Sequence, residues 1–531
     1  MISLTHLSPL PVTYILLLLA SLRVVYSIWI RNSFHRRPPG PTPIPLLGNV
    51  HQLPMDYQER AMQQWGKRFD AVGNLIYARF FRRHTIMINS IEVAQDLLEK
   101  RGANYSDRPP FVLHTELMGW KSMLVHMRYG DNFRIARKWA HDAFSNKNAL
   151  KSYIPLQHKE TYTLLAGLVD SPQDMVAHFA RFTAATITEI TYGHAVTGNN
   201  DPYIHLADEA AGATVEAGSP ASMLVDFIPI LKYYPTWLPG AGWKLKAYAV
   251  RDLAKQMVDY PYNMVKSQMA AGVAQPSLVS KVIEQISAQK GSLTPEDEQL
   301  LKSTAGTLYG AGVETTQNVF TAFVLAMVRY PHVFQKAREE VDRVVGVDRL
   351  PDFGDRESLP YLECVIKETM RWHVPTPLGI LGIPHYTMKD DVYNGWVIPA
   401  RSLVITNIWA IANNPTDFTE PEEFRPERWE AMGKEKSERL DPRNYVFGFG
   451  RRLCPARDFA DKNSFLVLAN MIATLNIKRA LDDHGREIVP EHSYKSGFVH
   501  SALSHIHPFK CDIKPRSAQA ARLIAQLVAS S

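Results

Sequence analysis

Cysteine is scarce in this sequence, which contains only Cys364, Cys454 and Cys511 among its 531 residues. An odd and sparse set of cysteines is not a disulfide framework of the kind that holds small secreted domains together. We therefore expect most of the chain to lie in a reducing compartment.

The chain also lacks a strong charge of either sign. Its 59 basic and 53 acidic residues leave a formal net charge of +6, and no basic run is interleaved with aromatic residues. This composition gives no indication of a nucleic-acid-binding surface. Internal repeats, low-complexity segments and long polar linkers are absent too, and 46% of the residues are hydrophobic. We therefore expect residues 50–515 to form one compact unit, followed by a C-terminal tail at 516–531.

A long apolar run lies near the N-terminus, at residues 10–30. About 20 apolar residues can span a bilayer as a helix, and the arginines that follow place the next segment on the cytoplasmic side. Arg23 lies in the last third of the run, from where its side chain can reach the headgroups. A cleaved signal peptide is the alternative, but the positive charge follows the run and no clean cleavage site is evident. We expect residues 1–31 to be a retained membrane anchor.

Five prolines lie between residues 36 and 49, shortly after the predicted anchor. Proline fixes φ and cannot continue a helix. We expect residues 32–49 to be a stiff hinge that orients the body relative to a membrane, with a plain linker as the alternative.

Helical periodicity dominates between short strand-like runs at residues 74–81, 84–90 and 395–409, which predicts a mainly α fold with small sheets at one side. The longest predicted helix covers residues 294–329, with a capping box at its start and Pro331 beyond its end. Such a helix would be roughly 50 Å long and would cross the whole domain.

The middle of this predicted helix contains the unusual stretch AGTLYGAGVETTQ. Glycine costs about 1 kcal/mol relative to alanine inside a helix, so three glycines need a reason. One reason is close helix packing on small residues. The other is room for a ligand beside the backbone, with Glu314 and Thr315 facing it.

Cys454 lies in the stretch FGFGRRLCPAR. A metal-binding thiol has to be deprotonated, and nearby positive charge and a helix N-terminus both lower its pKa. Arg452 supplies charge, and Pro455 is predicted to begin a helix, while Gly448 and Gly450 allow the close approach of a flat ligand. No C-x-x-C or H-x-x-x-H spacing nearby supports zinc or iron–sulfur. The pattern favours a single sulfur ligand; a cysteine nucleophile would need a nearby histidine that a sequence cannot place.

The sequence around Cys454 resembles the haem-binding signature F-x-x-G-x-R-x-C-x-[GA] of the cytochrome P-450 family of haem-thiolate monooxygenases. The matching residues are Phe447, Gly450, Arg452, Cys454 and Ala456. Other family landmarks occur in the family's order: AGVETT resembles the oxygen-binding motif of the central helix, KETMR contains the E-x-x-R pair, and PERW follows it. The resemblance covers essentially the whole chain and looks most like fungal members of secondary metabolism.

This resemblance implies haem b as the cofactor, with the Cys454 thiolate as the axial ligand of its iron. A thiolate ligand pushes electron density onto the iron and favours O–O cleavage. The family pattern also implies that Arg452, Arg137 and His385 contact the haem propionates. Phe133 stands where the family has tryptophan, so one N–H donor to a propionate is lost.

Glu314 and Thr315 are implied to be the catalytic pair on the oxygen side of the haem. A hydroxyl can hold oxygen there, and a carboxylate can relay protons through water. Gly312 is expected to leave space for the oxygen. A glutamate without a function would be costly on a helix that crosses the core.

The E-x-x-R pair is implied to hold the fold rather than to take part in catalysis. Glu368 and Arg371 are three residues apart, so they share one face of a helix. With Arg428 of the PERW stretch they are expected to form an ion-pair network below the haem.

The resemblance implies a membrane-anchored monooxygenase that inserts one atom of O2 into a small apolar substrate in fungal secondary metabolism. No flavin or nicotinamide motif is fused to the chain, so electrons are expected from NADPH–cytochrome reductase, with cytochrome b5 as an additional donor. The expected location is the endoplasmic reticulum membrane, with the catalytic domain facing the cytoplasm. A haem-binding sensor or carrier, and an isomerase or dehydratase on the same fold, are the alternatives that the Glu314–Thr315 pair disfavours.

Several segments are expected, by analogy, to shape the pocket and the approach to it. The pocket itself should be lined by mostly apolar segments, which suits a terpenoid, aromatic or alkaloid skeleton: residues 111–124, 308–315, 374–383 and 497–500. Residues 226–244 are rich in aromatics and are expected to form a second membrane contact, with an ordinary core position as the alternative. At residues 378–383 Leu-Gly-Ile occurs twice in tandem. Three added residues must form a bulge, or they reflect a misplaced intron boundary.

Overall fold

The structure is a computed structural model that describes residues 36–530, except 70–73, 197, 199–200, 219–222, 380–382 and 498–500, together with Tyr14 and Ser21. Within this part of the chain, no helix combines the length and the apolarity needed to cross a membrane. The predicted anchor at residues 1–31 lies outside the described residues except for Tyr14 and Ser21, and it stays a prediction. Half of the Leu-Gly-Ile repeat, at 380–382, lies outside them as well.

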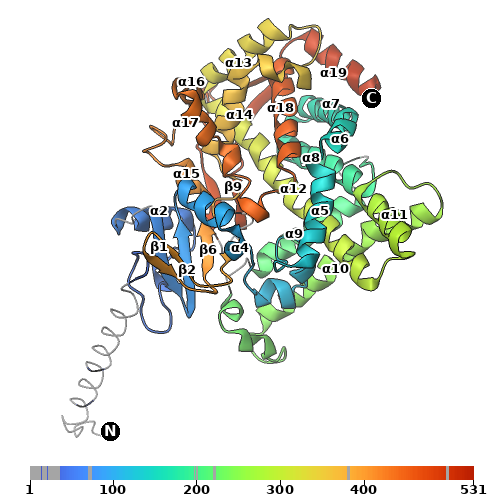
Figure 1. The fold of residues 1–531 in the computed structure, drawn as a ribbon. Coiled ribbons are helices and arrows are strands. Elements are labelled where there is room, and N and C mark those ends of the chain that lie inside the picture. Colours follow the sequence, from blue (N-terminus) through green and yellow to red (C-terminus); the bar gives the residue numbers. More distant parts are fainter. Residues whose placement is uncertain are drawn as a thin grey trace, which may run out of the picture.

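Helices form most of the body, and the main sheet lies at one side of it, as the sequence predicts (Figure 1). The helices of eleven or more residues are α2 (Gln58–Arg68), α5 (Asp131–Phe144), α7 (Ile154–Asp170), α8 (Met175–Tyr192), α9 (Pro202–Ala217), α10 (Gly242–Ala270), α11 (Leu278–Lys290), α12 (Pro295–Arg329), α13 (Pro331–Val344), α14 (Pro360–Trp372), α18 (Arg457–Thr474) and α19 (Ala518–Ser530). Shorter α-helices are α3 (Ile91–Ala94), α4 (Gly102–Tyr105), α6 (Lys147–Ser152), α15 (Ile408–Ala412), α16 (Glu427–Ala431) and α17 (Lys434–Arg439).

The main sheet has the strand order β1-β2-β6-β3. It contains the predicted runs 74–81 and 84–90 and part of the run 395–409, the rest of which forms a strand of a separate ladder and the start of α15. β1 (Leu75–Phe80) pairs antiparallel with β2 (Arg83–Ile88), which pairs in parallel with β6 (Leu403–Thr406). β3 (His385–Tyr386) lies antiparallel on the other side of β6. The two-stranded ladders are β4 (Asp391–Tyr393) with β5 (Trp396–Ile398), β7 (Leu475–Arg479) with β10 (Cys511–Pro515), and β8 (Tyr494–Gly497) with β9 (Ser501–Ile506).

The described part of the proline-rich segment is held against the main sheet. The N–H of Tyr77 donates to the carbonyl of Pro39 at 3.0 Å. The side-chain amide of Asn49 donates to the carbonyl of Pro41 at 3.0 Å. Because proline also restricts the backbone itself, the chain is fixed to the body from residue 36 onward.

α12 runs through the middle of the body and is the longest described helix (Figure 1). Its predicted start is confirmed: the N–H of Asp297 donates to Oγ1 of Thr294, the Asp297 carboxylate accepts from the N–H of Thr294, and Pro295 is the first helical residue. Its N-terminal half packs into one hydrophobic core with α5, α8 and α10, and its C-terminal half into another with α7, α14 and α18. Residues 311–319 lie between these cores and are mostly half-buried.

Two glycines of this helix are required by close packing. A Cβ atom on Gly306 would lie 2.7 Å from Cγ1 of Val258 in α10, and one on Gly312 would lie 2.4 Å from Cδ1 of Ile187 in α8. A side chain at either position would therefore require the contacted side chain of Val258 or Ile187 to move. Gly312 also lines the cavity that contains Cys454, so its expected role in leaving space for oxygen stays a prediction.

The segment assigned to a C-terminal tail, 516–531, contains α19. This helix packs against α7 and α18. Ala520 and Ile524 are its buried residues, so an apolar face fixes it to the body.

Candidate active site

Cys454 lies in the turn that precedes α18. Its N–H donates to the carbonyl of Phe447 at 2.8 Å, which closes the turn. Gly450 adopts a φ of +55°, and a Cβ atom there would lie 2.1 Å from the carbonyl oxygen of Leu98. Glycine is needed at 450 because both the backbone conformation and this close approach exclude a side chain.

The thiol lies slightly farther from the helix than predicted. α18 begins at Arg457 with Ala456 as its N-cap, so Pro455 is not its first residue. Burial, the largest effect, raises the pKa of the Cys454 thiol. The N–H of Ala456 and the charges of Arg137 and Arg457 act in the opposite direction.

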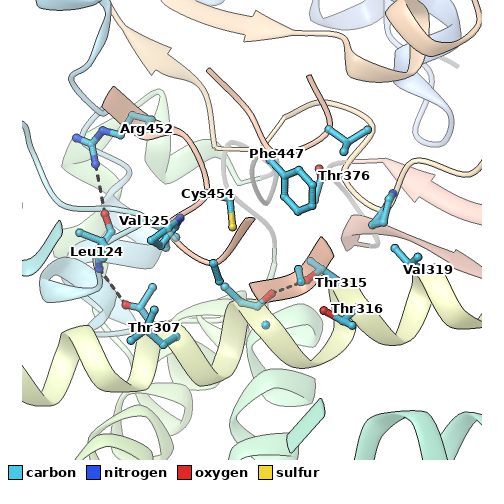
Figure 2. A pocket seen from close by; sticks show the side chains of 18 of the residues that line it. Leu124, Val125, Thr307, Thr315, Thr316, Val319, Thr376, Phe447, Arg452 and Cys454 are labelled. Atoms are coloured by element: carbon cyan, nitrogen blue, oxygen red, sulfur yellow. Dashed lines mark hydrogen bonds between the residues drawn. The ribbon is translucent and has the colours of Figure 1, made fainter. Parts of the chain in front are cut away.

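A cavity separates Cys454 from the middle of α12 (Figure 2). The sulfur points across this space toward the helix segment that carries Thr315 and Thr316. Apolar side chains provide most of the remaining wall. They include Leu124, Val125, Phe133, Leu308, Val319, Met370, Val446 and Phe447.

Arg452 lines the same cavity, but its guanidinium points to backbone carbonyls and not to the sulfur (Figure 2). It donates to the carbonyl of Ser106 at 2.8 Å and to that of Met127 at 2.7 Å, and it lies 3.7 Å from the centre of the Phe133 ring. Burial, with repulsion from Arg108, lowers the pKa of Arg452 to about 8. The predicted role of Arg452 in lowering the pKa of the thiol is therefore taken by other arginines.

Two further guanidiniums line the cavity. Arg137 of α5 forms no hydrogen bond with another described residue. Arg108 is fully buried and donates to the carbonyls of Ile383 at 2.5 Å and Pro384 at 2.8 Å, while its Nε has no partner among the described residues. Burial lowers the pKa of both, that of Arg108 to about 10. Sequence reasoning missed Arg108. The only feature that marks it in the sequence is that this charged residue directly precedes two prolines.

His385 lies close to the cavity but does not line it. Its Nδ1 is 2.8 Å from the carbonyl oxygen of Tyr105. Burial lowers the pKa of His385 to about 3, and the charges of Arg108 and Arg452 contribute. The side chain is therefore within electrostatic reach of two arginines of the cavity wall.

Thr315 and Glu314 border different spaces. Thr315 lines the Cys454 cavity, and its Oγ1 donates to the carbonyl of Ala311 at 2.9 Å (Figure 2). Glu314 lines a second cavity, here called the distal cavity. Val125, Thr307 and Ala311 line both, so the two spaces are neighbours. The two residues predicted as one catalytic pair are thus divided between adjacent cavities.

The Glu314 carboxyl has few charged neighbours. As much as 41% of its side chain is accessible, yet burial raises its pKa, with repulsion from Asp208 adding to the effect. A partly accessible side chain with a raised pKa indicates that the Glu314 carboxyl borders an enclosed space rather than open solvent. Nε2 of His505 lies 3.9 Å from Oε2 of Glu314.

The predicted ion-pair network is confirmed. Both carboxylate oxygens of Glu368 accept from Arg371, at 2.8 and 2.9 Å, and neither side chain is exposed. Nε of Arg428 and the indole N–H of Trp429 donate to the same carboxylate at 2.9 and 3.0 Å. Arg371 also donates to three backbone carbonyls, so the network joins α14 to the segment before α16.

Comparison with known proteins identifies the family. Residues 38–499 match the profile of the family described as "Cytochrome P450". The chain belongs to the cytochrome P-450 family. "Cytochrome P450 monooxygenase 136" of Postia placenta is 43% identical over 518 residues, which cover 97% of this chain and 96% of that protein. "Cytochrome P450 monooxygenase claR" of Ampulloclitocybe clavipes is 39% identical over 495 residues, covering 93% and 88%.

Cytochromes P-450 are haem-thiolate monooxygenases that contain haem b with a cysteine thiolate as axial ligand, and they use O2, a small substrate and redox partners. The Cys454 cavity of this cytochrome P-450 fits that cofactor. It offers a thiol and apolar walls for a flat ring, and its guanidiniums include Nε of Arg108, which has no hydrogen-bond partner in the part of the chain that the structure describes. No carboxylate occurs among the described residues of its lining, so the two propionates of haem would supply the missing negative charge.

The distal cavity of this cytochrome P-450 takes residues from three of the four predicted pocket segments. Residues 111–124, 308–315 and 374–383 contribute to it, whereas 498–500 lie outside the described residues and nearby Leu503 contributes instead. Sequence reasoning missed the wall formed by α9 and α10. The lining is also less apolar than expected, since it includes His114, His126, Asp208 and Glu314.

Proposed function

We propose that Cys454 is the axial haem ligand and that Arg108, Arg137 and Arg452 hold the haem propionates. The observation that carries this proposal is the presence of one thiol, three guanidiniums and α12 around a single apolar cavity. Among the described residues, Nε of Arg108 has no hydrogen-bond partner and Arg137 donates no hydrogen bond. His385 is proposed as a supporting contact, because it lies within electrostatic reach of two of these arginines.

We propose that Thr315 and Glu314 assist oxygen activation, with the Thr315 hydroxyl positioning water and oxygen and the Glu314 carboxyl relaying protons. When bound, haem supplies the iron at which dioxygen is activated. Oγ1 of Thr315 borders the Cys454 cavity, and its proton is held by the Ala311 carbonyl, so its oxygen is free to accept a hydrogen bond from water. Burial and repulsion from Asp208 raise the pKa of Glu314, so its carboxyl holds a proton more readily than an exposed carboxylate does, which suits a proton relay.

The distal cavity is the proposed substrate site. It adjoins the Cys454 cavity at Val125, Thr307 and Ala311, which places a ligand there next to the haem site. Its apolar residues support a small, largely apolar substrate with a terpenoid, aromatic or alkaloid skeleton. The fungal relatives support a place in fungal secondary metabolism.

We propose single-pass anchoring in the endoplasmic reticulum membrane through residues 1–31, with the body facing the cytoplasm and receiving electrons from NADPH–cytochrome reductase. Residues 226–244 are proposed as a second membrane contact. The ring of Phe227 lies 4.8 Å from that of Phe81, whose N–H donates to the carbonyl of Leu47, so this segment lies beside the proline-rich one. Large apolar side chains are exposed along both, which supports contact with lipid: Leu46, Ile230, Tyr233 and Trp237.

The test is the spectrum of the reduced protein with carbon monoxide. Thiolate ligation gives a far red-shifted Soret band, and Cys454→His should abolish it because a histidine cannot donate the same electron density. Cys511→Ala is the matched control, since Cys511 lies in β10 and does not line the cavity. A histidine-type spectrum from the wild-type protein would refute the assignment.

A further inference from the structure

The source of protons for Glu314 can be sought among its neighbours. Among the described residues no lysine or arginine forms an ion pair with this carboxylate. The group in reach is the imidazole of His505, whose Nε2 lies 3.9 Å from Oε2 of Glu314. His505 belongs to β9, a strand that packs against α12.

The side chains of His505 and Glu314 approach each other beside the distal cavity. Leu503 lines the distal cavity, and His505 follows two residues later, so both leave the same face of β9. The side chains of His505 and Glu314 are 42% and 41% accessible, so water can reach both. A distance of 3.9 Å is longer than a direct hydrogen bond, and one bridging water can span it.

We infer that His505 delivers protons to Glu314 from the solvent side of β9. This inference rests on the proposed role of Glu314. In the step, Nε2–H of the imidazolium gives its proton, through one water, to Oε2 of the carboxylate. Neutral imidazole remains and takes up a proton from bulk water, so charge and protons balance. His505 acts through Glu314 and is therefore a positioning residue rather than a catalytic one.

The proton affinities of the two groups are brought closer together by their surroundings. Burial lowers the pKa of His505, whereas burial and Asp208 on α9 raise that of Glu314. A smaller difference between the two pKa values lowers the free-energy difference for moving a proton between the two groups.

Other titratable groups near the pair can be named among the described residues. His373, the residue that follows α14, is kept neutral, since burial lowers its pKa to about 4. Lys495 is the cross-strand partner of His505 in the β8–β9 ladder. Tyr309 of α12 is close enough for Glu314 to affect its pKa, which burial and nearby carboxylates raise.

Electrostatic coupling between the pair is measured first, by an NMR titration of the haem-loaded protein with labelled histidine. His505→Gln identifies the signal of His505. Glu314→Gln should lower the pKa of His505 by about 0.7 pH unit, the value expected for unit charges 4 Å apart in water. Glu296→Gln, an exposed change in the first turn of α12, should leave it unchanged. An equal pKa in Glu314→Gln and wild type would overturn the inference.

Proton delivery is measured second, as hydrogen peroxide released per NADPH consumed with the reductase and O2, from pH 6 to pH 9. His505→Gln should raise the peroxide fraction at least threefold at high pH and less at low pH, where protons are abundant. His507→Gln, an exposed change just after β9, should match wild type. A peroxide fraction unchanged in His505→Gln would overturn the inference even if the titrations are coupled. Failure of the proposed function is recognised separately, by the absence of the red-shifted Soret band.

Discussion

The buried carboxylate of Glu368 offers a sharp test of how this fold is held together. It accepts five hydrogen bonds, two from Arg371 and one each from Arg428, Trp429 and the N–H of Arg425, at 2.8 to 3.0 Å. Glu368→Gln keeps the shape of the side chain but removes its negative charge. It also places an NH2 group, itself a donor, against N–H groups that need an acceptor. Breaking a buried ion pair costs about 3–5 kcal/mol.

Against a typical stability of about 5–15 kcal/mol, a loss of 3 kcal/mol changes the ratio of unfolded to folded protein roughly 150-fold. Denaturant unfolding of purified Glu368→Gln, together with haem content per chain, should detect this loss. Glu438→Gln is the control, because Glu438 faces Lys434 at 3.9 Å on the surface and exposed pairs contribute about 0–1 kcal/mol. If Glu368→Gln were within 1 kcal/mol of wild type, the network would not be what stabilises this region.

Three further predictions concern the site and its approach. Thr315→Ala should keep haem and substrate binding but release hydrogen peroxide in place of product. Thr316→Ala, on the same wall, should form nearly as much product per NADPH consumed as the wild type. Equal coupling in Thr315→Ala and wild type would remove Thr315 from the mechanism. Deleting residues 1–30 should free much of the protein from membranes and leave a fraction bound through 226–244, and complete solubility without detergent would show that this second contact does not exist. Deleting residues 381–383 should improve haem loading and leave substrate difference spectra unchanged, whereas altered spectra would mean that the repeat shapes the pocket.

Local signals were sufficient to predict the elements whose formation depends on local chemistry. The capping box and Pro331 define α12 within the sequence itself, and the ion-pair network follows from the i, i+3 spacing of Glu368 and Arg371. The strands of the main sheet were predictable as runs of β-forming residues. Their order was not, because the parallel pairing of β2 with β6 joins segments about 300 residues apart.

The candidate site was predictable only where one motif carries its chemistry. Cys454, Arg452 and Arg137 line one cavity as expected, but Arg108 has no motif that distinguishes it from a surface arginine. The separation of Glu314 from Thr315 depends on the rotation of α12 relative to α9, which no spacing along the chain encodes. The same is true of the α9 and α10 walls of the distal cavity.

The shared wall of the two cavities has a consequence for how such enzymes diversify. Val125, Thr307 and Ala311 are the described side chains that border both spaces, and Ala311 contributes a single methyl group. Under the proposed function, residues of α9 and the 111–124 segment determine which substrate is bound. The three residues shared by both cavities determine how far that substrate extends toward Cys454. After a gene duplication, exchange of Ala311 for valine would change which carbon is oxidised without changing which compound is bound. Recognition and regioselectivity can therefore be inherited separately.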